Sequence, residues 1–348
     1  MKSPGDGHGG GHFPPAAGDP GKDVVWQRSA NSARAPSWPG MQKRGLKGCQ
    51  GEYMKVFVTG VTGYIGGSVA MRLLEAGHSV RGLARNEGQF DALRALGIEP
   101  VYGSLDDTQL LMREARAADA VINAASSDHR GALESLLAAL AGSGKALLHT
   151  SGSSVVGDAV AGTRLNGKVY DEHTPLDVMP EKSGRHALDT LVCQTEGVRG
   201  IVLCNSLIYG RGRGLQRDSV QIPALVSQAQ ESGVVRTVGP GLNRWSTIHV
   251  EDMSDLYLLT LEQARGRGFY FVENGESSFA EIAQSIARCL GISRIEQWTE
   301  AEAISYWGLN KARYSLGSNS RVRATRAREE LGWKPRHPSV IQWILESL

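Results

Sequence analysis

Three glycines at intervals of three residues could form a phosphate-binding turn. Gly60, Gly63 and Gly66 lie in the segment TGVTGYIGG, after an apolar run typical of a buried strand and before a helical pattern. The first would permit the tight turn, the second would let the backbone approach a pyrophosphate, and the third would let helix and strand pack closely. Free N–H groups at the start of the helix would attract the phosphates. We expect a dinucleotide to bind here, with a purely structural turn as the alternative.

The end of the second apolar run indicates which dinucleotide would bind. An acidic side chain at this point would accept a hydrogen bond from the ribose 2′-hydroxyl of NAD. The segment is GLARN, so Ala84 takes the place of the acid and Arg85 follows it. Arg85 could pair with a 2′-phosphate, and a solvated surface arginine is the alternative. The sequence therefore favours NADP, while NAD stays open.

Alternating strand and helix patterns would position these residues. Their lengths and order predict an α/β fold with a doubly wound parallel sheet, the Rossmann fold, whose strands all end at one ligand-binding edge. We expect an NAD(P)-binding Rossmann domain at residues 54–210 and a smaller C-terminal substrate-binding lobe at residues 211–348, with a strand and a helix that return to the sheet. The predicted strands are KVFVTG, SVRGLA, IEPVYG, ADAVINAA and KALLHTS, and the predicted helices span residues 68–76, 89–96, 131–141 and 220–231.

Residues 1–53 differ from the rest of the chain. Their Gly- and Pro-rich start has no periodic apolar pattern and cannot bury enough surface to offset its ordering entropy. We expect a disordered N-terminal extension, with Met54 as the natural start of the folded part. From there on, 31 lysines and arginines face 32 aspartates and glutamates, which excludes the basic surface of a nucleic-acid-binding protein.

The remaining composition limits the class of protein. No apolar run approaches the ~18 residues that a membrane-spanning helix needs. The four cysteines lack metal-ligand spacing and are interpreted as reduced thiols of a cytosolic protein. We expect a cytoplasmic protein that binds a small-molecule substrate, without a metal, nucleic acid or membrane partner; a homodimer stays open.

Several motifs resemble those of the extended short-chain dehydrogenase/reductases, the NAD-dependent epimerase/dehydratase family. TGVTGYIG resembles that family's TGxxGxxG, and GSLDD resembles its GDLxD after the third strand. The segments INAAS, HTSGSSVVGD, IVLCNSLIYGRG, STIHVEDMSDLYLLTLE and ELGWKP resemble further family motifs. The resemblance covers nearly all of residues 54–348 and implies an NAD(P)-binding Rossmann fold.

The catalytic signature of that family is missing. In the family, a tyrosine follows the fifth strand, and a lysine four residues later lowers the pKa of the tyrosine, which exchanges a proton with substrate. Alignment of the downstream acidic position with Asp189 puts Glu181 at the tyrosine and Arg185 at the lysine. The family's serine or threonine lies among residues 150–153. The loss resembles atypical family members, some of which bind the cofactor without the usual chemistry.

Glu181 and Arg185 have a functional and a structural interpretation. Glu181 could act as a general acid or base if partial burial raised its pKa, with Arg185 holding the nicotinamide ribose. Arg185, one helical turn away, would keep Glu181 ionised and so favour a base role. The alternative is a solvated helix face.

The resemblance implies an enzyme, an NAD(P)-dependent oxidoreductase or epimerase/dehydratase-like protein that acts on a small carbonyl or hydroxyl compound, sugar-nucleotide-like compounds included. The alternative is a non-catalytic NAD(P)-sensing or regulatory protein of the same fold. The candidate catalytic residues are Ser151, Ser153, Glu181 and Arg185, the candidate cofactor-binding residues are Thr59, Gly60, Thr62, Gly63, Tyr64, Ile65, Gly66, Arg85, Leu105, Ala124 and Ala125, and the candidate substrate-binding residues are Tyr209 and His249.

Overall fold

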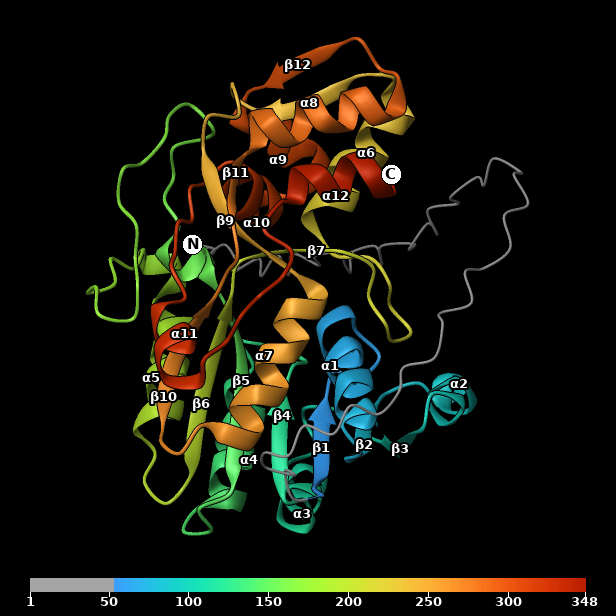
Figure 1. Cartoon of the computed structure of the whole chain (residues 1–348), viewed down its shortest axis with the longest axis vertical. Coiled ribbons are helices and arrows are strands. Elements are labelled where there is room, and N and C mark those ends of the chain that lie inside the picture. Colours follow the sequence, from blue (N-terminus) through green and yellow to red (C-terminus); the bar gives the residue numbers. More distant parts are fainter. Residues whose placement is uncertain (1–52) are drawn as a thin grey trace, which may run out of the picture. The chain divides into compact units, whose positions relative to one another are not determined.

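A seven-stranded sheet is the centre of residues 53–348, the part of the chain that the structure, a computed structural model, describes (Figure 1). Every neighbouring pair of strands in it is parallel, in the order β10-β6-β5-β4-β1-β2-β3. These strands are β1 (Lys55–Thr59), β2 (Ser79–Ala84), β3 (Ile98–Tyr102), β4 (Ala120–Asn123), β5 (Ala146–Gly152), β6 (Arg199–Asn205) and β10 (Gly268–Val272). The predicted doubly wound Rossmann sheet is confirmed, whereas the prediction for residues 1–53 lies outside the described residues except at Tyr53.

Helices cover both faces of the sheet, so its strands are apolar on both sides. On one face α1 packs against α7, and α7 packs against α11; on the other face α3 packs against α4, with α5 beside α4. Apolar clusters on the two faces include Leu73 and Leu256 on one side and Leu133 and Leu188 on the other, all nearly free of solvent contact. The helices around the sheet are α1 (Tyr64–Glu75), α2 (Phe90–Ala95), α3 (Thr108–Ala117), α4 (Arg130–Leu140), α5 (Ser183–Gln194), α7 (Val250–Gln263) and α11 (Thr325–Leu331), with short helical turns η1 (Glu87–Gln89), η2 (Ser153–Val156) and η3 (Pro180–Lys182).

Two details of the sequence prediction needed correction. Helix α1 begins at Tyr64, directly after the glycine turn, and not at Ser68. Gly66 and Gly67 suggest a break in a helix, but here they allow close packing, since a Cβ on Gly67 would lie 3.0 Å from the Gly214 Cα atom. Helix α3, between β3 and β4, had not been predicted; its first turn is capped by Asp107, which accepts a hydrogen bond from the Leu110 N–H.

A smaller group of elements lies beyond the carboxyl edge of the central sheet (Figure 1). It contains a three-stranded sheet in the order β11-β9-β7 and the parallel pair β12-β8. Strand β10 and helix α7 come from the same half of the sequence but pack on the central sheet. The elements of this group are β7 (Leu207–Tyr209), α6 (Gln221–Ser232), β8 (Val235–Val238), β9 (Arg244–His249), β11 (Glu276–Ser278), α8 (Phe279–Leu290), β12 (Ile295–Trp298), α9 (Glu300–Trp307), α10 (Leu309–Lys311), η4 (Ala312–Leu316) and α12 (Val340–Ser347).

The order of the strands reverses between β1 and β4. From β1 the chain continues to β2 and β3 on one side, and then returns to β4 on the other. The crevice outside the carboxyl ends of such neighbours is where open α/β sheets bind ligands. In residues 53–348, no helix has both the length and the apolar character to cross a membrane.

Candidate functional site

The glycine turn between β1 and α1 is shaped by close backbone contacts. Gly60 has φ of +73°, and a Cβ atom there would lie 2.6 Å from the carbonyl oxygen of Ala124. A Cβ atom on Gly66 would overlap the Gly60 carbonyl oxygen. Gly63 has extended backbone and closes the turn by donating its N–H to the Gly60 oxygen over 2.9 Å. Gly60 and Gly66 are therefore required by packing, while a Cβ atom on Gly63 would meet only the Gly60 carbonyl oxygen, at 3.3 Å.

Two cavities meet at this turn, and both are lined by Gly63 and Ala124. The smaller one, of about 400 Å³, lies at the ends of β2, β3 and β4, next to the turn. The larger one, of about 700 Å³, lies between the ends of β5 and β6 and the smaller group of elements. The N-terminus of α1, with its unpaired N–H groups, lies at the residues that the two cavities share.

Most of the predicted cofactor-binding residues line these cavities. Arg85 is exposed at the edge of the smaller cavity and forms no hydrogen bond or ion pair with another residue in the described part of the chain. Thr59 does not line either cavity; it is buried, and its hydroxyl donates to Asn123 Oδ1 over 2.6 Å. The predicted residues that line one or both cavities are Gly60, Thr62, Gly63, Tyr64, Ile65, Arg85, Leu105, Ala124 and Ala125.

Ser151 and Ser153 both line the larger cavity, at the end of β5 and the start of η2. The Ser151 hydroxyl donates to the Asp189 carboxyl group over 2.7 Å. The Ser153 hydroxyl accepts a hydrogen bond from Ser320 over 2.7 Å. Ser151 thus connects the cavity to a buried carboxyl group, whereas Ser153 connects it to a neutral hydroxyl group.

Glu181 and Arg185 also line the larger cavity, but they do not form the expected pair. Glu181 lies on the short turn η3, is exposed, and makes no hydrogen bond or ion pair with another described residue. The burial that a proton-transferring Glu181 would require is therefore missing. Arg185 binds both carboxylate oxygens of Asp128, at 2.8 and 2.5 Å, and donates to the Ser154 hydroxyl over 3.1 Å. Arg185 thus pairs with Asp128 and forms no ion pair with Glu181.

Lys182 and Tyr314 are cavity residues that the sequence analysis missed. The Lys182 ammonium group lies 4.4 Å from the centre of the Tyr314 ring. Partial burial, together with the Arg185 charge, lowers the pKa of Lys182. Lys182 follows Glu181 directly in the sequence, whereas Tyr314 comes from η4, more than a hundred residues away, without a motif of its own.

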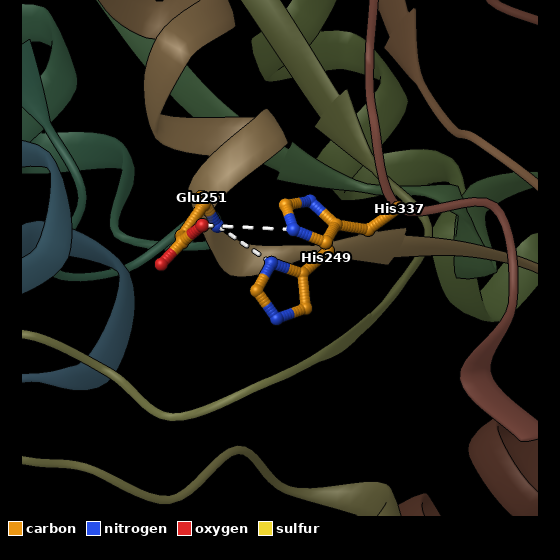
Figure 2. Close-up of side chains that lie close together, drawn as sticks. All are labelled: His249, Glu251 and His337. Carbon is orange, nitrogen blue, oxygen red and sulfur yellow. Dashed lines mark hydrogen bonds and ion pairs between the residues drawn. The ribbon is translucent and has the colours of Figure 1, made fainter. Parts of the chain in front are cut away.

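Tyr209 and His249, the predicted substrate-binding residues, do not line either of these two cavities. Tyr209 is fully buried and donates its hydroxyl proton to the His337 carbonyl oxygen over 2.7 Å. The His249 ring packs on His337, with ring centres 4.1 Å apart, and its Nδ1 atom accepts the Glu251 N–H at the start of α7 (Figure 2). Both side chains therefore make contacts within the packing between elements, and their role toward a substrate stays a prediction.

The cluster of His249, Glu251 and His337 has the residue types of a metal site, and potential ligand atoms of the three lie within 4.8 Å of one another (Figure 2). Its geometry serves another purpose. One nitrogen of His249 is engaged with the helix N-terminus, and the other faces Gly210, where a Cβ atom would lie 2.5 Å from it. Burial and the neighbouring His337 lower the pKa of His249 to about 4, so the ring is neutral and can accept the capping hydrogen bond.

Known proteins resemble the chain in both sequence and fold. Residues 56–270 match the NAD dependent epimerase/dehydratase family. An uncharacterised protein of Schizosaccharomyces pombe, C2A9.02, is 31% identical over 304 residues, which cover 83% of this chain and 97% of the relative. The 2-alkyl-3-oxoalkanoate reductase of Stenotrophomonas maltophilia is 26% identical over 287 residues, covering 76% and 82%.

Among solved structures, the dTDP-glucose 4,6-dehydratase of Bacillus anthracis, in complex with NAD, has a similar fold, with a TM-score of 0.65. The two chains are 21% identical, and the similarity covers 84% of this chain and 97% of the dehydratase. At this level of identity, the comparison shows a common fold but not a common reaction.

Proposed function

The chain belongs to the NAD-dependent epimerase/dehydratase family, and on that premise we propose that it is an NADP-dependent reductase of a carbonyl compound. The family and its reductase relatives support the broader functional class, an NAD(P)-dependent oxidoreductase or epimerase-like protein. The observation that carries the proposal is the pair of cavities joined at Gly63 and Ala124, on either side of the α1 N-terminus.

The residues present fit a dinucleotide. The N-terminus of α1 and the open face of Gly63 would hold the pyrophosphate, and the smaller cavity would hold the adenosine. Arg85 stands where a 2′-phosphate would lie and has no competing partner in the described part of the chain, which supports NADP over NAD. The nicotinamide, in the larger cavity, would supply the hydride of the reduction.

The larger cavity favours a substrate without a diphosphate group. Two cations line it, Lys182 and Arg185. Arg185 is already neutralised by the two-pronged ion pair with Asp128, which leaves Lys182 alone for an anionic group. A nucleotide sugar would bring a charged diphosphate and require several cationic or N–H donors. We therefore favour a carbonyl compound with at most one carboxylate, such as a keto acid, over a sugar nucleotide.

Thermal shift and calorimetry with NAD, NADH, NADP and NADPH test the cofactor. We expect NADP(H) to stabilise the protein most. Turnover is then measured with a panel of ketones and keto acids, and UDP-glucose is included as the competing substrate class. Preferential binding of UDP-glucose would overturn the substrate class, and tight cofactor binding without turnover on any compound would favour the cofactor-sensing alternative.

A further inference from the structure

The carboxyl group of Asp189 lies between two cavities on opposite sides of α5. Its side chain is only 1% exposed. On one side its Oδ2 atom accepts the Ser151 hydroxyl proton over 2.7 Å, and Ser151 lines the larger cavity. On the other side Asp189 itself lines a third cavity, of about 240 Å³, together with His186 and Glu172. One buried acid therefore connects the substrate cavity with a second space by way of a single hydroxyl group.

The hydrogen bonding of Asp189 is incomplete. Its Oδ1 atom is buried and has no hydrogen-bond partner among the described residues. His149 Nε2 lies 3.8 Å from it and is also buried and unpartnered. The other ring nitrogen of His149 lies 3.1 Å from the side-chain amide of Asn123. A carboxylate kept only for packing would leave a costly unsatisfied oxygen, whereas a protonated carboxyl group needs fewer partners.

Several titratable groups face this carboxyl group. His149 and Ser151 come from β5, Arg185 and Cys193 lie on the same helix as Asp189, Cys204 comes from β6, and Asp128 comes from the loop after β4. Burial is the largest influence and raises the pKa of Asp189 to about 7, against the lowering effects of the Ser151 hydrogen bond and the Arg185 charge. Burial likewise lowers the pKa of His149 to about 4, so His149 remains neutral. Asp189 is thus the group in this cluster that changes protonation near neutral pH.

We propose that Asp189 and Ser151 form a proton relay that takes over the role of the missing tyrosine, with Asp189 as the buried proton store and Ser151 as the group that touches substrate. The inference rests on the proposed reductase function. As the carbonyl carbon accepts a hydride from the reduced dinucleotide, the carbonyl oxygen takes the Ser151 hydroxyl proton. With Asp189 protonated, this 2.7 Å hydrogen bond reverses: the Asp189 O–H donates to the Ser151 oxygen, which takes that proton as it gives up its own. The resulting carboxylate recovers a proton from water through the third cavity. The reverse transfers serve alcohol oxidation.

The proton relay predicts opposite pH dependences of kcat for carbonyl reduction and for alcohol oxidation. Carbonyl reduction requires protonated Asp189, so kcat should fall as the pH rises through about 7. Alcohol oxidation requires the carboxylate, so its kcat should fall as the pH drops through the same value. A positioning role limited to holding Ser151 in place would change the size of kcat and leave the shape of both profiles unchanged.

The test uses the full chain with Asp189→Asn and Ser151→Ala. Infrared spectroscopy of the protein without cofactor should show a carboxyl C=O band that titrates near pH 7, disappears in Asp189→Asn and shifts in Ser151→Ala. Both variants should lose about 10²-fold or more in kcat and lose the inflection near pH 7, while calorimetry shows unchanged cofactor affinity.

Two results would overturn the relay. One is the absence of a carboxyl band that depends on Asp189. The other is a wild-type pH profile and kcat in Ser151→Ala, which is the less disruptive variant if Asp189→Asn does not fold. Failure of the reductase proposal is recognised separately, because it would show in the wild type as missing cofactor binding or as cofactor binding without turnover on any compound, and it would leave the infrared band unaffected.

Discussion

The smaller and the larger cavity are built from the sequence in different ways. All residues that line the smaller cavity lie between Gly60 and His129, at the end of β2 and in loops that follow successive strands. Residues that line the larger cavity extend from Gly63 to Ser315 and include segments of both halves of the chain. The smaller cavity, the proposed cofactor half, is therefore a local product of backbone geometry. The larger cavity, the proposed substrate half, depends on long-range packing and on ionisable groups that this packing buries.

The largest effect should come from the buried acid of the substrate half. Because the pKa of folded Asp189 is raised to about 7, above its unfolded value of about 3.9, its contribution to stability is full below pH 4. That contribution is lost as the pH rises through 7, by an amount on the order of 4 kcal/mol. Urea unfolding at pH 4, 5.5 and 7.5 measures it. Asp189→Asn should remove this loss, and an equal pH dependence in both proteins would contradict the expectation.

Substitutions at two glycines of the cofactor half should have different effects, one on the stability of the fold and the other on cofactor binding. Gly66→Ala places a Cβ atom against the Gly60 carbonyl oxygen, and we expect it to lower the free energy of unfolding by about 1–3 kcal/mol. Gly63→Ala is the matched variant, since its Cβ atom would lie 3.3 Å from the same oxygen and its backbone is extended. It should retain the melting temperature and lose cofactor affinity, because the methyl group stands at the junction of the cavities. A wild-type affinity in Gly63→Ala would place the pyrophosphate elsewhere.

Arg85 is the residue of the cofactor half that we expect to select NADP over NAD. Arg85→Ala should weaken NADP binding by about 1–3 kcal/mol and leave NAD binding nearly unchanged, because the arginine would bond only the 2′-phosphate. Calorimetry with both cofactors decides this. Arg94→Ala is the control, an exposed arginine on α2 that pairs with Asp91 and lines neither cavity. Equal losses for the two cofactors would remove Arg85 as the selectivity residue.

The difference between the two cavities also explains which parts of the structure could be predicted from the sequence. The glycine turn and the first five strands follow from local patterns, and the structure reproduces them closely. The contact between Ser151 and Asp189 spans 38 residues, and no spacing rule indicates that the two side chains meet. Asp189 entered the sequence analysis as an alignment marker. Its chemistry depends on burial between β5, β6 and α5, which only the packed structure reveals.

Tyr209 and His249 also show the limit of predicting side-chain positions from motifs. Both lie in segments that resemble family motifs, and the strands β7 and β9 that carry them lie at the expected edge. Whether such a side chain faces the cavity or the interior is decided by neighbours such as His337, which follows β9 by almost ninety residues. Motif similarity therefore located the elements correctly but did not indicate which way these two side chains point.

The smallest effect is expected at Glu181, where the tyrosine of the family would stand. An acid or base must lie within hydrogen-bond reach of its proton and have a suitable pKa, and the pKa of a carboxyl group rises when it is buried or placed beside another negative charge. Glu181 is exposed on η3, and Arg185 is engaged by Asp128. Glu181→Gln should therefore change kcat by no more than about twofold, as a surface substitution does. A fall of about 10²-fold with unchanged cofactor affinity would return proton transfer to Glu181, and it would mean that substrate closes the rim of the larger cavity over this side chain.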